Sequence, residues 1–123
     1  MENSRIDFLY LSEQDMIKAG VNNMADCLSS MEDMFKLLVA GDYRMGGENG
    51  NEHGIRLSFP KESNVPGMPL HEPDKRMMAM PAYLGGKYKL YGCKTYGSNP
   101  HNKEYNQPRS ILMMSLMDHI TGA

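Results

Sequence analysis

The segment MAMPAYLGGKYKLYGCKTYG, residues 78–97, constrains the fold of this chain more than any other. Two arms that carry aromatic residues flank Gly85 and Gly86, and glycine readily adopts the positive φ values of a two-residue hairpin turn. The segment therefore predicts an antiparallel hairpin with its turn at the two glycines. Proline cannot donate a hydrogen bond to a neighbouring strand, so Pro81 is expected at a sheet edge or at a bulge.

Lys94 lies in the second arm of this hairpin. Because successive side chains of a strand alternate between faces, one face carries Tyr88, Leu90, Gly92, Lys94 and Tyr96. An ammonium group thus falls on the more apolar face, where Gly92 leaves space beside it. Burying a charge without a partner is costly, so this lysine needs a physical reason for its place.

Two further strands are predicted. In GIRLSFP, residues 54–60, apolar residues alternate with Arg56 and a serine until the proline, so Arg56 points away from the apolar face. SILMMSLMD, residues 110–118, is a mostly apolar run of strand length, which is typical of a buried strand. Between the first of these strands and the hairpin, residues 61–76 hold three prolines and six charges, which indicates an irregular excursion.

Two helices are predicted ahead of the strands. The first begins at Ser12, which can form a capping box with Asp15, and ends at about Ala19 before a glycine. The second ends before Gly41, and its apolar residues recur at spacings of three and four. These residues are Met24, Cys27, Leu28, Met31, Met34, Phe35 and Leu38. We therefore expect an α/β chain of the α+β class, with both helices packed on a mixed or antiparallel sheet and Cys27 buried as a small hydrophobe.

The glycine-rich run GGENGNEHG, residues 46–54, reads as a polar loop. Its glycines do not match the spacing of the dinucleotide or Walker phosphate loops, and a helix end rather than a strand precedes it. Glu48, Glu52 and His53 are interpreted as solvated side chains rather than metal ligands. We therefore expect no metal site in this chain.

The composition limits the classes of function. A chain of 123 residues suits one domain. Its 13 basic and 15 acidic residues give a net charge of -2, which argues against nucleic acid and against a membrane surface as partners. Two cysteines without a CxxC pair, and a charged start without the character of a signal peptide, predict a soluble cytoplasmic protein.

Three cations fall on or beside the predicted strands: Arg56, Lys94 and Arg109. In one interpretation each is solvated, with Arg56 on an exposed face, Arg109 in a loop, and the ammonium of Lys94 reaching water along Tyr96. In the other, Arg56 and Lys94 converge on one anion, because arginine offers a planar fork to a carboxylate and lysine a compact charge. A bound ligand would then explain the place of Lys94.

A series of motifs along the chain carries a family resemblance. In order they are YLSEQDMIKAG, GDY, IRLSFP, MAMPAYLGG, GCKTYGSNPHN, QPRSILM and LMDHITGA. Together, from about Phe8 to Ala123, they resemble the amino-terminal part of the ornithine cyclodeaminase and mu-crystallin family. The stretches RLSFPKES, MPAYLGG and PRSILM look most like the members known as type-B subunits of tyramine oxidase.

The resemblance implies a fold and a division of labour. Residues 1–123 correspond to the family's substrate-binding and dimerisation domain, whose strands join those of a second subunit. In the family a Rossmann domain for NAD or NADP follows, and this chain stops before it. We therefore expect the chain alone to be inactive and to bind neither cofactor tightly. The expected partners are a small amino or imino acid and a second copy of the chain, as a homodimer.

The resemblance also implies roles for single residues. Arg56 and Lys94 match the basic residues that hold the substrate α-carboxylate, and Ser110 lies where some members place a small hydroxyl residue near the nicotinamide cofactor. No catalytic residue is assigned. In the family's cyclodeaminase reaction a hydride leaves the α-carbon for the cofactor, the ring closes with loss of ammonia, and the hydride returns. The alternative is a non-enzymatic ligand-binding protein or accessory subunit of the same fold.

Overall fold

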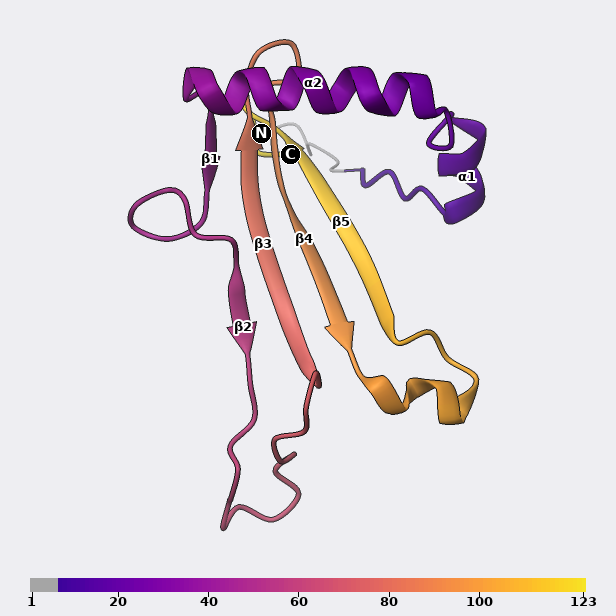
Figure 1. The fold of residues 1–123 in the computed structure, drawn as a ribbon, viewed down its shortest axis with the longest axis vertical. Coiled ribbons are helices and arrows are strands. Elements are labelled where there is room, and N and C mark those ends of the chain that lie inside the picture. The colour runs from indigo at the N-terminus through magenta and orange to yellow at the C-terminus, as the bar shows by residue number, and fades with distance from the viewer. Residues whose placement is uncertain (1–6) are drawn as a thin grey trace, which may run out of the picture. The chain divides into compact units, whose positions relative to one another are not determined.

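The structure is a computed structural model that describes residues 7–123; the start of the charged N-terminal segment, residues 1–6, lies outside the described part. The elements, in chain order, are α1 (Glu13–Lys18), α2 (Met24–Ala40), β1 (Tyr43–Met45), β2 (Ile55–Leu57), β3 (Arg76–Leu84), β4 (Leu90–Ser98), the 3-10 helix η1 (Pro100–Tyr105) and β5 (Ser110–Asp118) (Figure 1). The helices precede an antiparallel sheet, so the predicted α+β class is confirmed. The described residues lack the alternation of strand and helix that a parallel sheet requires.

The chain divides into two compact units, residues 1–36 and residues 37–123. In the described part of the first unit, the side chain of Ser12 accepts from the backbone N–H of Asp15 at 3.3 Å, while the Asp15 carboxylate accepts from the Ser12 N–H at 2.9 Å. Asn23 caps α2 by accepting from the N–H groups of the second and third residues after it. Both predicted helix starts are thus confirmed, because local side chains satisfy the first free N–H groups.

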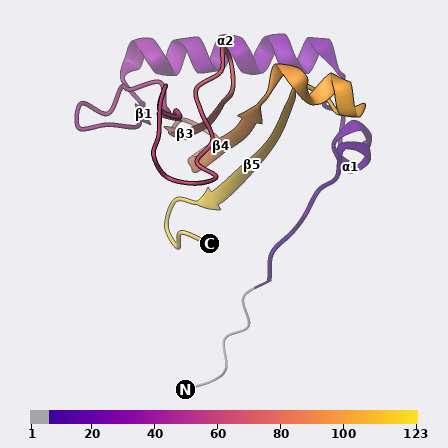
Figure 2. The same cartoon turned by 90° about the horizontal axis from the view of Figure 1, so that it is seen from below.

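The second unit contains the sheet, in which β3 is the shared strand. β1 pairs with the 82–84 end of β3, and β2 pairs with the 77–79 end of the same edge. On its other edge β3 pairs with β4 over its whole length, and β4 pairs in turn with β5 (Figures 1 and 2). The predicted strands and the hairpin are therefore confirmed, and each pair is antiparallel.

Pro81 corrects one detail of the prediction. It lies within β3, which has neighbours on both edges, and not in an edge strand. However, β1 stops its pairing at Ala82 and β2 at Ala79, so neither short strand pairs with Pro81. The interruption between two short strands provides the place for a residue that lacks an N–H donor.

The hairpin turn is longer than predicted. Leu84 pairs with Leu90, so five residues, 85–89, form the connection in place of two glycines. The carbonyl of Gly85 accepts from the N–H groups of Tyr88 and Lys89, and Lys89 adopts a φ of 46°. Asp42 anchors this turn, because its carbonyl and its carboxylate accept from the N–H groups of the two glycines, at 3.0 Å and 2.8 Å. A contact distant in sequence thus decides the turn type.

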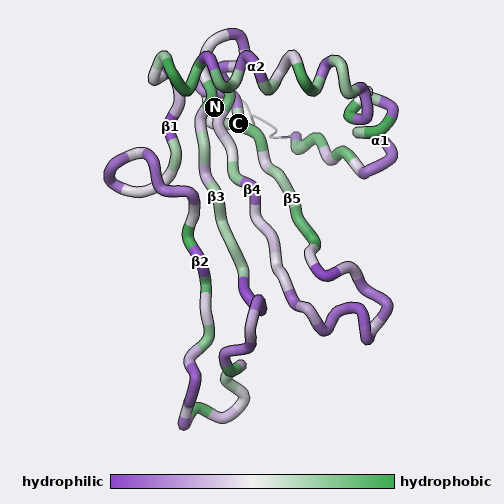
Figure 3. Tube along the Cα trace, in the orientation of Figure 1, coloured by the Kyte–Doolittle hydropathy of each residue, from purple (hydrophilic) through white to green (hydrophobic). Residues whose placement is uncertain are grey.

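Burial also differs from the expectation. The sequence predicts a buried strand at β5, but every residue in it except Ser115 is exposed, because β5 forms an edge of the sheet and pairs with β4 alone among the described strands. Figure 3 shows this strand coloured hydrophobic along much of its length. Cys27, expected inside, is exposed. Across residues 7–123 no apolar side chain is fully buried.

Among the helices of residues 7–123, none has both the length and the apolar character needed to span a lipid bilayer. The longest, α2, carries three acidic residues. The excursion over residues 61–75 lacks helix and strand as predicted, and it leads directly into β3.

Candidate functional site

The sheet register places Arg56 and Lys94 on the same face. Arg56 is opposite Met78 of β3, and Met78 is opposite Tyr96 of β4. Directly opposed residues share a face, and Lys94 is two residues from Tyr96, so all of them share it. We name the strand residues that share this side the Lys94 face; they include Arg56, Arg76, Met78, Met80, Lys94, Tyr96, Ser98, Leu112 and Met114.

The spacing between the two cations suits one small anion. Arg56 and Lys94 are two strands and two residues apart, which puts their Cα atoms about 12 Å from each other in a regular sheet. Both side chains are long, and the methionines at 78 and 80 lie between them in the register. The two charged groups can therefore approach a ligand from opposite sides, above an apolar floor.

Lys94 contacts an aromatic ring. Its Nζ lies 5.6 Å from the ring centroid of Tyr96, within the range of a cation–π interaction. The residue as a whole is half-buried. The ammonium thus follows the tyrosine, as in the first of the two sequence interpretations, and this position still leaves it on the same face as Arg56.

Gly92 has a different role from the one predicted. A Cβ at this position would clash with the carbonyl oxygen of Ser115 in β5. The glycine therefore permits close approach of two strand backbones and does not leave space beside Lys94.

Arg76 belongs to the Lys94 face and was missed in the sequence. Its Cζ lies 6.0 Å from the Tyr96 ring centroid, so the ring has a cation near it from β3 and another from β4. Hydrogen bonding to Tyr96 raises the pKa of Arg76, and the Asp74 carboxylate raises it further. Alternation in RMMAMPAYL would have placed Arg76 with Met78 and Met80, but its position opposite the Tyr96 strand required the true length of the turn.

Arg109 is an ion-paired residue at the start of β5. One of its terminal nitrogens lies 3.1 Å from Asp74, and more than half of its side chain is exposed. It comes directly before Ser110, so it does not join the strand positions of the Lys94 face. The interpretation of Arg109 as a solvated charge outside the site agrees with this position.

A comparison with known families decides the wider relationship. The model of the ornithine cyclodeaminase/mu-crystallin family matches residues 20–123. The chain belongs to this family. No curated protein and no solved structure matches it, so the narrower likeness to the type-B subunits of tyramine oxidase stays a prediction.

Ornithine cyclodeaminase/mu-crystallin family membership raises the question of a nicotinamide dinucleotide. Ser110 begins β5 opposite Ser98 and is exposed, which leaves it accessible. The glycine-rich loop, however, joins two antiparallel strands, and its own backbone uses the N–H groups of Gly50 and Glu52. A phosphate loop instead offers free N–H groups at the start of a helix. The described residues therefore do not fit a dinucleotide, and we derive no chemical step through one.

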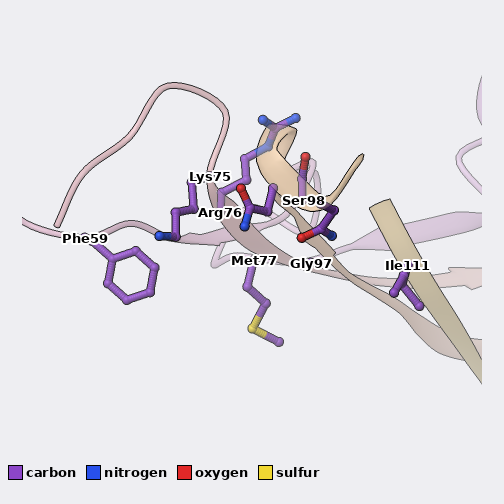
Figure 4. A pocket seen from close by; sticks show the side chains of 9 residues that line it. Phe59, Lys75, Arg76, Met77, Gly97, Ser98 and Ile111 are labelled. Carbon is purple, nitrogen blue, oxygen red and sulfur yellow. The ribbon is translucent and has the colours of Figure 1, made fainter. Parts of the chain in front are cut away.

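Two other site types were considered for this member of the family. No three His, Cys, Asp or Glu side chains of residues 7–123 gather in a way that could hold a metal ion. A pocket of about 300 Å³ lies at the end of β3 and β4 (Figure 4). Its lining consists of Phe59, Lys75, Arg76, Met77, Gly97, Ser98, Asn99, Asn102 and Ile111. Arg76 links this pocket to the Lys94 face.

Proposed function

We propose that this chain binds the α-carboxylate of a small amino or imino acid through Arg56 and Lys94. It would do so as the substrate-binding domain, residues 1–123, of an ornithine cyclodeaminase-like enzyme that uses NAD or NADP. The observation that carries the proposal is the register, which brings both cations to one face of one sheet. Family membership supplies the class of protein.

The electrostatics of the Lys94 face support an anionic ligand. Among the strand residues on this face the acidic residue is Asp118, which pairs with Leu90 at the opposite end from Arg56. Its carboxylate already accepts from the N–H groups of Ile120 and Thr121, and these bonds lower its pKa. No strand carboxylate therefore lies between the two cations, and an incoming carboxylate would meet both.

The proposed role of both residues is positioning. A guanidinium can hold the two oxygens of a carboxylate with parallel hydrogen bonds, and the ammonium adds a point charge. A ligand fixed in this way keeps its α-carbon at a defined height above the sheet. Such orientation lowers the entropic part of a barrier without taking part in the bond changes.

The chain is also proposed to form a homodimer through β5. This strand has an unpaired edge among the described residues, and Ile111, Met113 and Leu116 are each about three-fifths exposed. An apolar strand edge is a common site of pairing with another chain. The same exposed edge would serve the alternative, a non-enzymatic ligand-binding protein or an accessory subunit of the tyramine oxidase kind. A cytoplasmic location remains a prediction.

Binding of an L-amino acid and of its α-carboxamide tests the carboxylate site. Isothermal titration calorimetry on the wild-type chain should show at least tenfold tighter binding of the acid, because the amide lacks the charge. Arg56→Met and Lys94→Met should each remove most of that preference while keeping an apolar stem.

Arg44→Met is the matched control for this experiment. Arg44 pairs with Tyr83 on the opposite side of the sheet and donates to the carbonyls of Gly41 and Tyr43. It should leave the preference unchanged. Equal binding of acid and amide by the wild-type chain would contradict the proposed function.

A further inference from the structure

We infer that Arg76 and Ser98 form a second anion subsite on the Lys94 face, so that the substrate is an amino or imino acid whose side chain ends in a carboxylate. The inference rests on the proposed function, since it takes the α-carboxylate to be held by Arg56 and Lys94. It adds the class of side chain that this site selects.

The two residues of the subsite are direct neighbours across the sheet. Arg76 of β3 is opposite Ser98 of β4, so their side chains share a face. Figure 4 shows both pointing to one side of the strands, whereas Met77 points to the other. Arg76 is two residues from Met78, the partner of Arg56, so the subsite adjoins the α-carboxylate site.

Ser98 is the observation that points to a ligand. It is 4% exposed, and its Oγ has no hydrogen-bond partner among the described residues. A buried hydroxyl without a partner costs free energy, so such groups in folded proteins normally find an acceptor or a donor. The hydroxyl can donate to a carboxylate oxygen that the neighbouring guanidinium also holds.

Positive charge remains at this subsite despite a nearby acid. The carboxylate of Asp74 lies 2.9 Å from Arg76 and 3.1 Å from Arg109, so one negative charge is shared by two guanidinium groups. Asp74 is also more than half exposed, which weakens its effect through solvent screening. The hydrogen bonds from Arg76 to Asp74 involve Nη1, and a guanidinium has five N–H donors. Capacity for a second anion therefore remains.

The distances suit a short ligand with an acid at each end. Lys94 Nζ and Arg76 Cζ lie 5.6 Å and 6.0 Å from the same ring centroid, that of Tyr96. A five-carbon dicarboxylic amino acid lying over this ring would have one carboxylate near each cation. A side chain ending in an amine would instead place a positive charge beside Arg76, which like-charge repulsion disfavours.

L-Glutamate and L-glutamine provide the test, because they have the same size and differ in the charge of the side chain. The wild-type chain should bind glutamate about tenfold more tightly than glutamine in calorimetric titrations. Arg76→Met should reduce glutamate to the affinity of glutamine and leave glutamine within about twofold. Ser98→Ala should reduce the preference about threefold, since one neutral donor is lost.

Arg109→Met is the matched control, because it also removes a guanidinium from Asp74 but lies outside the face; it should keep the preference. Circular dichroism checks the fold of each variant, and Ser98→Ala decides if Arg76→Met does not fold. Equal affinity for the two ligands overturns the subsite. If glutamine still binds and loses affinity in Arg56→Met, the subsite fails alone; if neither ligand binds, the proposed function fails with it.

Discussion

β4 and β5 are neighbouring strands of equal length whose environments differ. β4 lies between β3 and β5, and most of its residues are half-buried, although it contains Lys94 and two glycines. β5 is the more apolar strand in sequence, yet its residues are almost all exposed. The charged residue therefore lies in the interior strand and the apolar residues at the edge. The difference teaches that the position of a strand in the sheet, rather than its hydropathy, sets its burial here.

The largest expected effect breaks the contact between these two strands. Gly92→Ala places a methyl group against the Ser115 backbone, which cannot move aside as a side chain can. We expect a loss of about 3 kcal/mol in the free energy of unfolding, measured by urea denaturation. Gly97→Ala in the same strand is the control, since a Cβ there meets no atom within 4 Å. Similar stabilities of the two variants would show that β5 is not held so closely.

The next effect concerns the exposed side of the comparison. If β5 pairs with a second chain, Met113→Lys should weaken the dimer by about a hundredfold in dissociation constant, because a charge enters an apolar contact. Sedimentation equilibrium measures this constant. Met68→Lys, in the excursion before β3, replaces another exposed methionine and should leave the dimer intact. A wild-type chain that stays monomeric at all concentrations would remove β5 as an interface.

The smallest effect concerns the link between β4 and β5. In η1 the two ring nitrogens of His101 lie 2.8 Å from Glu104 and 3.4 Å from Glu72, and the Glu104 hydrogen bond is the first cause that raises the pKa of His101. A raised pKa in the folded state stabilises the fold fully below the ordinary value of 6.5, and this contribution is lost as the pH rises through the raised value.

His101→Gln tests this link. The wild-type chain should exceed the variant in thermal stability below that ordinary value, and the gap should close at alkaline pH. Glu104→Gln should narrow the same gap, since it removes the main cause of the shift. A difference that is independent of pH would show that protonation of His101 does not support η1.

Much of the fold could be predicted because its signals are local. Ser12 and Asp15 form a capping box within four residues, and alternation along GIRLSFP and GCKTYG is a property of each strand alone. The turn could not be predicted, because Asp42 takes up the N–H groups of Gly85 and Gly86 from more than forty residues away. Two glycines in sequence do not reveal that partner.

The site could be predicted only in part, for the same reason. The faces of Arg56 and Lys94 follow from alternation within their own strands, and the structure confirms that they share a side. Arg76 could not be added from sequence, because its place opposite Ser98 depends on the register that the turn sets. The exposure of β5 likewise depends on which strands surround it, and no residue of the strand itself encodes this.

A double-mutant cycle over Arg56 and Lys94 tests the central claim most directly, namely that the two side chains hold one carboxylate. The dissociation constant of one L-amino acid is measured for the wild-type chain, Arg56→Met, Lys94→Met and the double variant. The account predicts that the double variant binds about as weakly as either single one, because losing one cation already releases the carboxylate. Independent, additive losses, or no loss in either single variant, would contradict it.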